Sequence, residues 1–163
     1  VGIVLDISLR HNKEDKRIVD IVKDQLVKFV KTFDDEDYFY VFHEDNLKTF
    51  YKRGQQVYTI SKYQPSELEV DLLFALKQTL YILAGEDDDY LKFMYYITDK
   101  KVNEHFIKKV ENLNVKDGYE IKIETIDLSK INPQELTSYL TGVHNGDTCG
   151  RESEIKDIFS STN

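Results

Sequence analysis

The sequence is short of several features that define large classes of protein. It has one cysteine, Cys149, so no disulfide can form within the chain, which slightly favours a reducing compartment such as the cytoplasm. No apolar run reaches the ~18 residues of a membrane-spanning helix, and no signal-peptide pattern is visible. Positive charge is scarce, because 22 lysines and arginines stand against 30 aspartates and glutamates, giving a net charge of −8. We therefore expect neither a nucleic-acid-binding protein nor a membrane span in this segment.

The chain of 163 residues has the size of one domain. Folding at this length buries roughly 70% of the surface of the unfolded chain, which gives a core large enough to need no disulfide or metal ion for stability. Apolar and amphipathic runs alternate along the whole length, with no repeat, low-complexity tract or linker. We expect residues 1–163 to form a single domain. The first residue is valine rather than methionine, so we also expect this domain to be part of a longer protein.

Strand-like and helix-like segments alternate along the chain. Apolar, aromatic and β-branched runs predict strands at VGIVLD (1–6), YFYVFH (38–43), FYKRGQQVYTI (50–60), LKFMYYIT (91–98) and YEIKIETIDL (119–128), with a short final one near 147–149. Alternation in 119–128 indicates an exposed or edge strand. Helical spacing covers residues 13–33, a run that starts at Pro65–Glu67 and stops at Gly85, and residues 102–113, 133–140 and 153–159. This order predicts an α/β fold, with a doubly wound, mostly parallel sheet and helices on both faces.

Two of the predicted strands end on an aspartate. VGIVLD closes on Asp6, and LKFMYYIT is followed at once by Asp99. Ligands of open α/β sheets bind beyond the carboxyl ends of the strands, so neighbouring strands would bring Asp6, Ser8, Thr98 and Asp99 to one edge. Clustered hard oxygens suit Mg²⁺, which takes few protein ligands and keeps several waters. The sequence therefore predicts a polar site at this edge.

These residues carry a resemblance to the von Willebrand factor type A domain family. The metal-ion-dependent adhesion site of that family begins with Asp-x-Ser-x-Ser after the first strand, and Asp6 and Ser8 match it in DISLR. FMYYITDK resembles the family's fourth strand, with Asp99 at the position of the metal-binding aspartate. VDLLFALKQTL resembles the family's Thr-Asp-Leu-x-x-Ala-Leu helix, and TGVHNGDTCGRESEIKDIF resembles its closing helix, strand and helix. The resemblance thus covers essentially the whole chain in order.

The sequence departs from the family's motif at two ligand positions. Arg10 stands where the second serine would be, and Val70 falls on the position of the family's threonine. A guanidinium within ~5 Å of two carboxylates competes with a divalent ion for the same negative charge. We expect Arg10 to pair with Asp6 or Asp99, and Mg²⁺ to bind weakly or not at all at Asp6, Ser8 and Asp99.

The resemblance implies a protein–protein interaction or scaffold module rather than an enzyme. The partner-binding residues would be Asp6, Ser8, Arg10 and Asp99, with Arg10 gripping a carboxylate of a protein partner. The alternative is a Mg²⁺-dependent phosphoryl-transfer or hydrolase domain that uses Asp6 and Asp99, although the chain has no G-x-G-x-x-G, P-loop or G-x-S-x-G motif. Asp6, Asp99 and Lys100 also faintly resemble the site of phospho-acceptor receiver domains. A purely structural domain is a third interpretation.

Two acidic clusters, DDED (34–37) and EDDD (86–89), each follow a predicted helix and precede a predicted strand. In a parallel sheet both should lie at the end opposite Asp6. Carboxylates beyond a helix C-terminus oppose the macrodipole, so they need solvent or a partner. One interpretation is a solubilising rim. The other is a contact for a basic partner or a loosely held Ca²⁺.

Overall fold

The computed structural model describes residues 1–7, 17–33, 37, 39–43, 46–50, 60 and 71–146. In this part of the chain, five strands form one sheet in the order β3-β2-β1-β4-β5. They are β1 (Gly2–Asp6), β2 (Phe39–His43), β3 (Asn46–Phe50), β4 (Phe93–Thr98) and β5 (Lys122–Asp127). All neighbouring pairs are parallel except β2 and β3, which pair antiparallel. The predicted α/β class with a mostly parallel, doubly wound sheet is confirmed, and β5 lies at the predicted edge.

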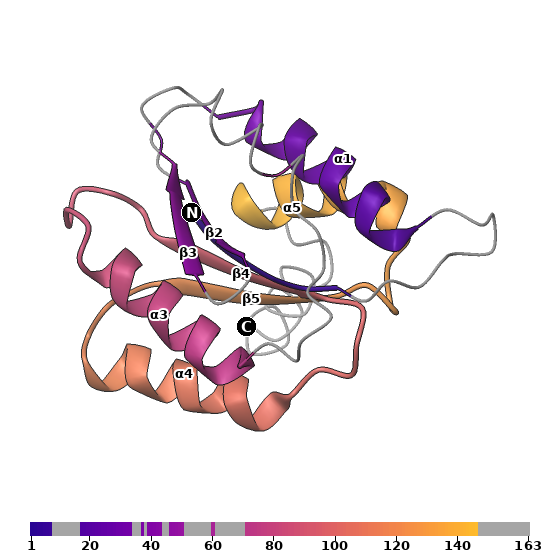
Figure 1. Cartoon of the computed structure of the whole chain (residues 1–163). Helices are drawn as coiled ribbons and strands as arrows, with labels where there is room; N and C mark the ends of the chain where they lie inside the picture. The colour runs from indigo at the N-terminus through magenta and orange to yellow at the C-terminus, as the bar shows by residue number, and fades with distance from the viewer. Residues whose placement is uncertain are drawn as a thin grey trace, which may run out of the picture.

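Helices cover both faces of the sheet (Figure 1). They are α1 (Ile18–Val30), α3 (Leu72–Ala84), α4 (Glu104–Lys116) and α5 (Leu136–His144), the last preceded by a 3₁₀ turn, η1 (Pro133–Glu135). α1 and α5 pack on one face, and α3 and α4 on the other. No helix among the described residues has the length and apolar character needed to cross a bilayer.

The central strands are buried on both faces. In β4, Tyr95 and Ile97 pack into the core under α1 and α5, whereas Met94 and Tyr96 pack under α3 and α4. All four side chains have an exposed fraction of 0%. Burial on both faces is why β1 and β4 are continuous apolar runs rather than alternating ones. Each such side chain contributes roughly 1.5–3 kcal/mol to the stability of the fold.

The close approach of β1 to α3 depends on Gly2. A Cβ atom built on Gly2 would lie 2.5 Å from Cγ2 of Thr79 and 3.0 Å from Cδ1 of Leu83. Thr79 is completely buried, and its hydroxyl donates to the carbonyl of Ala75 at 2.8 Å. A side chain at position 2 would therefore push the helix away from the sheet.

One predicted boundary is wrong. α3 begins at Leu72 rather than at Pro65–Glu67, because the Asp71 side chain accepts a hydrogen bond from the Phe74 amide at 3.0 Å and caps the helix there. Its predicted end at Gly85 is confirmed. β3 pairs antiparallel with β2 and shares only Phe50 with the strand predicted at 50–60, of which residues 51–59 lie outside the described part. The strand predicted at 147–149 and the helix at 153–159 lie outside the described residues.

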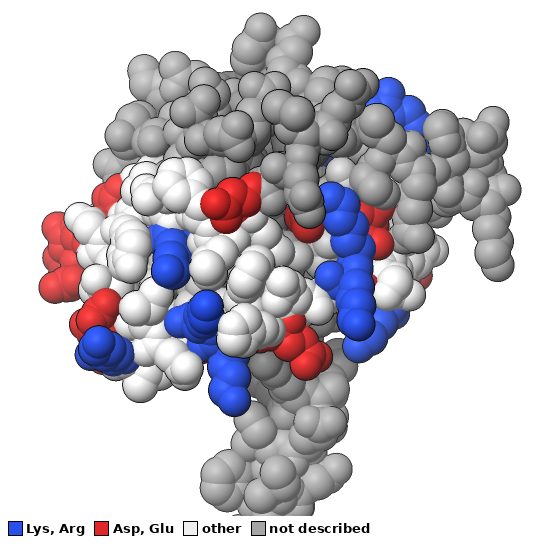
Figure 2. Space-filling model, turned by 60° about the horizontal axis from the view of Figure 1, so that its bottom comes forward, with Lys and Arg blue, Asp and Glu red and all other residues white. Residues whose placement is uncertain are grey.

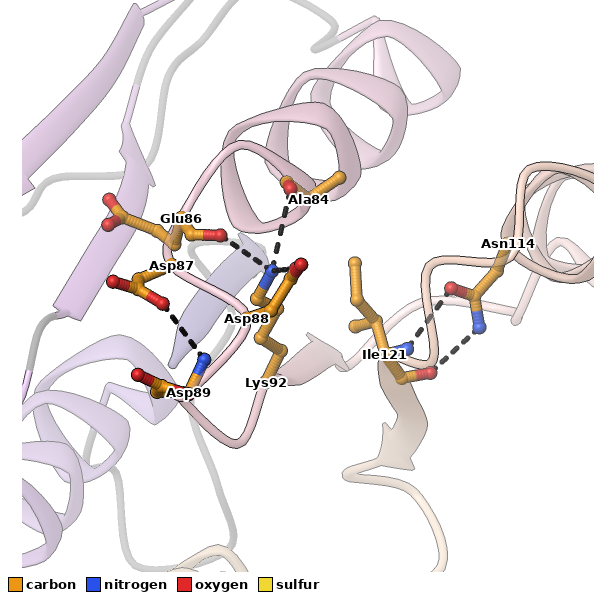
Figure 3. A network of polar contacts seen from close by, with 8 residues as sticks. All are labelled: Ala84, Glu86, Asp87, Asp88, Asp89, Lys92, Asn114 and Ile121. Carbon is orange, nitrogen blue, oxygen red and sulfur yellow. Dashed lines mark hydrogen bonds and ion pairs between the residues drawn. The ribbon is translucent and has the colours of Figure 1, made fainter.

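The lower end of the sheet, where the parallel strands begin, holds both acidic clusters as far as they are described. Asp37 and Glu86–Asp89 surround the start of β4, opposite Asp6, as predicted, while residues 34–36 lie outside the described part. The turn after α3 is organised by Lys92 (Figure 3). Its ammonium donates to the carbonyls of Glu86 at 2.8 Å and Ala84 at 3.4 Å, and it lies 3.6 Å from Asp88. A cation thus satisfies the end of the helix and offsets the acidic residues that follow it.

Candidate functional site

Three neighbouring parallel strands end side by side at the carboxyl edge of the sheet. The register places Asp6 of β1 beside Thr98 of β4, and Thr98 beside Asp127 of β5. Since side chains alternate along a strand, these three residues share the face that packs against α3 and α4. Asp127 was not among the predicted site residues, although its strand, IKIETID, ends on an aspartate just as VGIVLD does. We call the ends of these strands and the segments that follow them the carboxyl edge.

A lysine neutralises Asp6. The Lys100 ammonium lies 2.8 Å from Oδ1 of Asp6, and the exposed fractions of the two side chains are 49% and 13%. The Thr98 hydroxyl donates to the carbonyl of Asp6 at 3.1 Å and accepts from the Lys100 amide at 3.0 Å. Thr98 thus ties the end of β1 to the segment after β4, which holds Lys100 in place beside Asp6.

The hydroxyl of Tyr96 is a buried polar group under the same edge. Its side chain is completely buried, and its hydroxyl makes no well-aligned hydrogen bond among the described residues. Burial raises the pKa of Tyr96 to about 12, and the nearby charges of Asp6 and Asp127 act in the same direction, while the Thr98 side chain opposes them. The Tyr96 hydroxyl is therefore a buried polar group that interacts with the Asp6 and Thr98 side chains just below the carboxyl edge.

A groove of about 890 Å³ opens beside these residues, between the segment after β4, the start of α4 and the segment after β5. Its charged lining includes Lys100, Lys101 and Lys130, and its apolar lining includes Val102, Ile131 and the half-exposed Tyr139. Figure 2 shows a column of basic side chains at the right of this view and others at its lower left, with acidic side chains beside both groups. An apolar floor with a few polar groups at its margin is typical of a binding site.

Carboxylates at the groove are partly committed within the protein. Asp127 accepts hydrogen bonds from the Ser129 amide at 2.9 Å and the Ser129 hydroxyl at 2.6 Å. The Ser129 hydroxyl is the main cause that lowers the pKa of Asp127. Asp99 is 7% exposed. The three lysines are exposed, as is Glu104 at the start of α4, so the accessible charge at the groove is of both signs.

The structure brings Asp6 and Asp99 to one edge of the sheet, because β1 and β4 are parallel neighbours. Ser8, Arg10 and Val70 lie outside the described residues, so the pairing of Arg10 with Asp6 or Asp99 remains a prediction. The cation that the structure places beside Asp6 is Lys100. The sequence had indicated Lys100 only through the faint resemblance to receiver domains.

A divalent ion bound at Asp6 would have to share that carboxylate with a cation of the protein. Among the described residues, no group of three or more His, Cys, Asp or Glu side chains is arranged to hold a metal ion, and the predicted ligand Ser8 lies outside them. Mg²⁺ requires oxygen ligands at about 2.0–2.1 Å in near-octahedral geometry. One of the oxygens such an ion would use, Oδ1 of Asp6, is already in contact with the Lys100 ammonium.

Comparison with known proteins assigns the chain to no family. No protein-family model matches it, and no curated protein matches it either. The interpretation of the carboxyl edge therefore depends on the residues and distances described above.

Proposed function

We propose that this domain is a protein–protein interaction module that binds its partner at the carboxyl edge of the sheet without needing a divalent cation. The observation that carries the proposal is the ion pair between Lys100 and Asp6, placed beside an open groove. The resemblance to von Willebrand factor type A domains supports the same location, because members of that family bind partners at this edge through a metal. In this chain a lysine stands against the aspartate that a metal would use.

The ammonium of Lys100 can bind a group of the partner while it stays paired with Asp6. A lysine carries three N–H donors, and Asp6 takes one of them. The side chain is about half exposed, so its remaining donors can reach a carboxylate of the partner. Charge-assisted hydrogen bonds of this kind are roughly twice as strong as neutral ones. Arg10, which is predicted to lie at the same edge, would add a second cation for the same purpose.

The shape of the groove supports a peptide segment as the ligand. Val102, Ile131 and Tyr139 offer apolar contact surface, and Tyr139 is 41% exposed. Aromatic side chains contribute strongly at protein interfaces because they combine a large apolar area with a polar tip. We propose a partner segment that combines an acidic residue with an apolar one.

The geometry supports the enzyme alternative less well. A Mg²⁺-dependent phosphoryl-transfer or hydrolase site would need the Asp6 carboxylate as a metal ligand or nucleophile. The Asp6 side chain is only 13% exposed, and its carboxylate is in contact with Lys100. Lys100 would have to move away before Asp6 could take either role.

Site-specific photo-crosslinking tests the proposal. A photoreactive phenylalanine at position 101 or 130, at the groove, should capture the same partner from cells of the source organism, with EDTA present throughout. The control position is Val115, which is 80% exposed on α4 and does not line the groove. Capture that requires Mg²⁺, or equal capture from position 115, would contradict the proposal.

A further inference from the structure

A second cavity, of about 420 Å³, lies at the lower end of the sheet. Its walls are aromatic to an unusual degree, with the rings of Phe33, Tyr40, Tyr90, Phe93 and His144. Three carboxylates, those of Asp37, Glu86 and Asp89, join the same lining, together with Val1 and Lys92. The cavity therefore combines ring faces with three carboxylates and one lysine.

Lys92, the lysine that lines the cavity, makes its polar contacts with groups other than the Glu86 and Asp89 carboxylates, whereas the Val1 amine is near enough to Asp37 and Glu86 for their charges to act on its pKa. Lys92 is committed to the carbonyls of Ala84 and Glu86 and to Asp88. Figure 3 shows the carboxylate of Asp88 turned toward Lys92, whereas the side chain of Glu86 points away from it. The Glu86 carboxylate accepts a hydrogen bond from the buried Tyr40 hydroxyl instead. This bond holds Glu86 in place, in a cavity that both residues line.

His144 contributes an uncharged ring to the cavity at neutral pH. Its Nδ1 lies 2.7 Å from the Tyr95 hydroxyl, and its ring centroid lies 4.2 Å from that of Phe93 and 4.7 Å from that of Phe33. Burial is the main cause that lowers the pKa of His144. A neutral imidazole does not repel a bound cation, and the ring faces beside it attract one.

The margin of the cavity carries exposed apolar side chains. Leu91 is 84% exposed and Tyr90 is 42% exposed, and both line the cavity next to Asp89. Leu91 and Tyr90 thus offer apolar contact surface at the mouth of the cavity.

We propose that this cavity binds an arginine side chain of a protein partner. A guanidinium is planar, stacks on aromatic faces and pairs with carboxylates, so it matches both components of the lining. The apolar stem of arginine would contact Leu91 and Tyr90 at the margin. The site is separate from the carboxyl edge, since the two lie at opposite ends of the parallel strands, and either can fail without the other.

Small probes and amide NMR of the full chain test this proposal. N-acetyl-L-arginine amide should shift the resonances of residues that line the cavity, with a dissociation constant of about 1 mM, as expected for a ligand of this size. N-acetyl-L-citrulline amide has nearly the same shape without the charge, and should bind at least 10-fold more weakly. Glu86→Gln, which keeps an acceptor for Tyr40, and Asp89→Asn should each weaken arginine binding about 3–10-fold.

The matched control is Asp88→Asn, which removes one charge from the same turn but not from the cavity wall. It should leave the affinity for the arginine probe within about twofold. Equal binding of the arginine and citrulline probes, shifts centred elsewhere, or no binding at tens of millimolar would overturn the proposal. So would equal losses in Asp88→Asn and Glu86→Gln, which would indicate an unspecific effect of charge. Tighter binding of N-acetyl-L-lysine amide would overturn the choice of arginine.

Discussion

The ammonium of Lys100 lies 2.8 Å from a carboxylate oxygen of Asp6, joining residues 94 positions apart in the sequence. The contact exists because β1 and β4 are parallel neighbours that end in register. It places a positive charge of the protein itself against the aspartate on which the predicted metal site depends. The predicted loss of metal binding thus has a second physical cause besides Arg10 and Val70.

Restoring the missing ligands and removing the lysine should create a metal site. In the triple variant Arg10→Ser, Val70→Thr, Lys100→Met, we expect the melting temperature to rise with added Mg²⁺. A free ion at 100 times its dissociation constant stabilises the fold by about 2.7 kcal/mol, which corresponds to roughly 5–10 °C for a domain of this size. Arg10→Ser, Val70→Thr alone is the matched control and should respond less. If the double and triple variants respond alike, Lys100 does not compete with the ion.

Gly2→Ala should destabilise the domain by about 1–3 kcal/mol, because the added methyl group overpacks the contact between β1 and α3. The clash is with Cγ2 of Thr79. Thr79→Ser removes that atom and keeps the hydroxyl that bonds Ala75. The double variant should therefore lose less stability than the sum of the two single changes, as measured by urea unfolding. Strictly additive losses would place the strain elsewhere.

Lys92→Met should cost more than the loss of a surface lysine. It leaves the carbonyls of Ala84 and Glu86 without their donor and removes the cation from an acidic turn. We expect a loss of about 1–3 kcal/mol in the free energy of unfolding. Lys109→Met, at an exposed position of α4, is the control and should change stability by less than about 0.5 kcal/mol. Similar losses in the two variants would contradict the role assigned to Lys92.

His144 should make stability depend on pH on the acid side of neutrality. Its pKa in the folded state lies below the ordinary value of 6.5, so the unfolded chain binds the proton more readily. Stability should therefore fall as the pH drops below about 6.5, by at most about 1.4 kcal/mol per pH unit for one proton. Urea unfolding between pH 7.5 and 5 should show a shallower decline in His144→Phe than in the wild type. Parallel curves would show that His144 is not the group responsible.

The helices and strands that could be predicted from the sequence are those whose residue pattern has one dominant physical cause. β1 and β4 are continuous apolar runs because both of their faces are buried, and parallel pairing then brings Asp6 and Asp99 to one edge. The start of α3 was misplaced because Pro65–Glu67 gives a helix-start signal, while the cap that operates is Asp71. Both are local helix-start signals in the sequence, and only the structure shows at which of them α3 begins.

The contacts that define the site were less accessible to sequence reasoning. Lys100 meets Asp6 in a local conformation in which the Thr98 hydroxyl bonds both the Lys100 amide and the Asp6 carbonyl. Asp127 could have been found, because its strand ends on an aspartate as β1 does. The hydrogen bond between Tyr95 and His144 joins residues 49 positions apart, and no spacing rule indicates it.

The most direct test of the central claim is a calorimetric titration of the wild-type chain with Mg²⁺. If Lys100 supplies the positive charge at Asp6, the carboxyl edge needs no divalent ion. We therefore expect no saturable heat of binding up to millimolar Mg²⁺ at pH 7. A stoichiometric site with a micromolar dissociation constant would contradict it, because such an ion would have to displace Lys100 from Asp6.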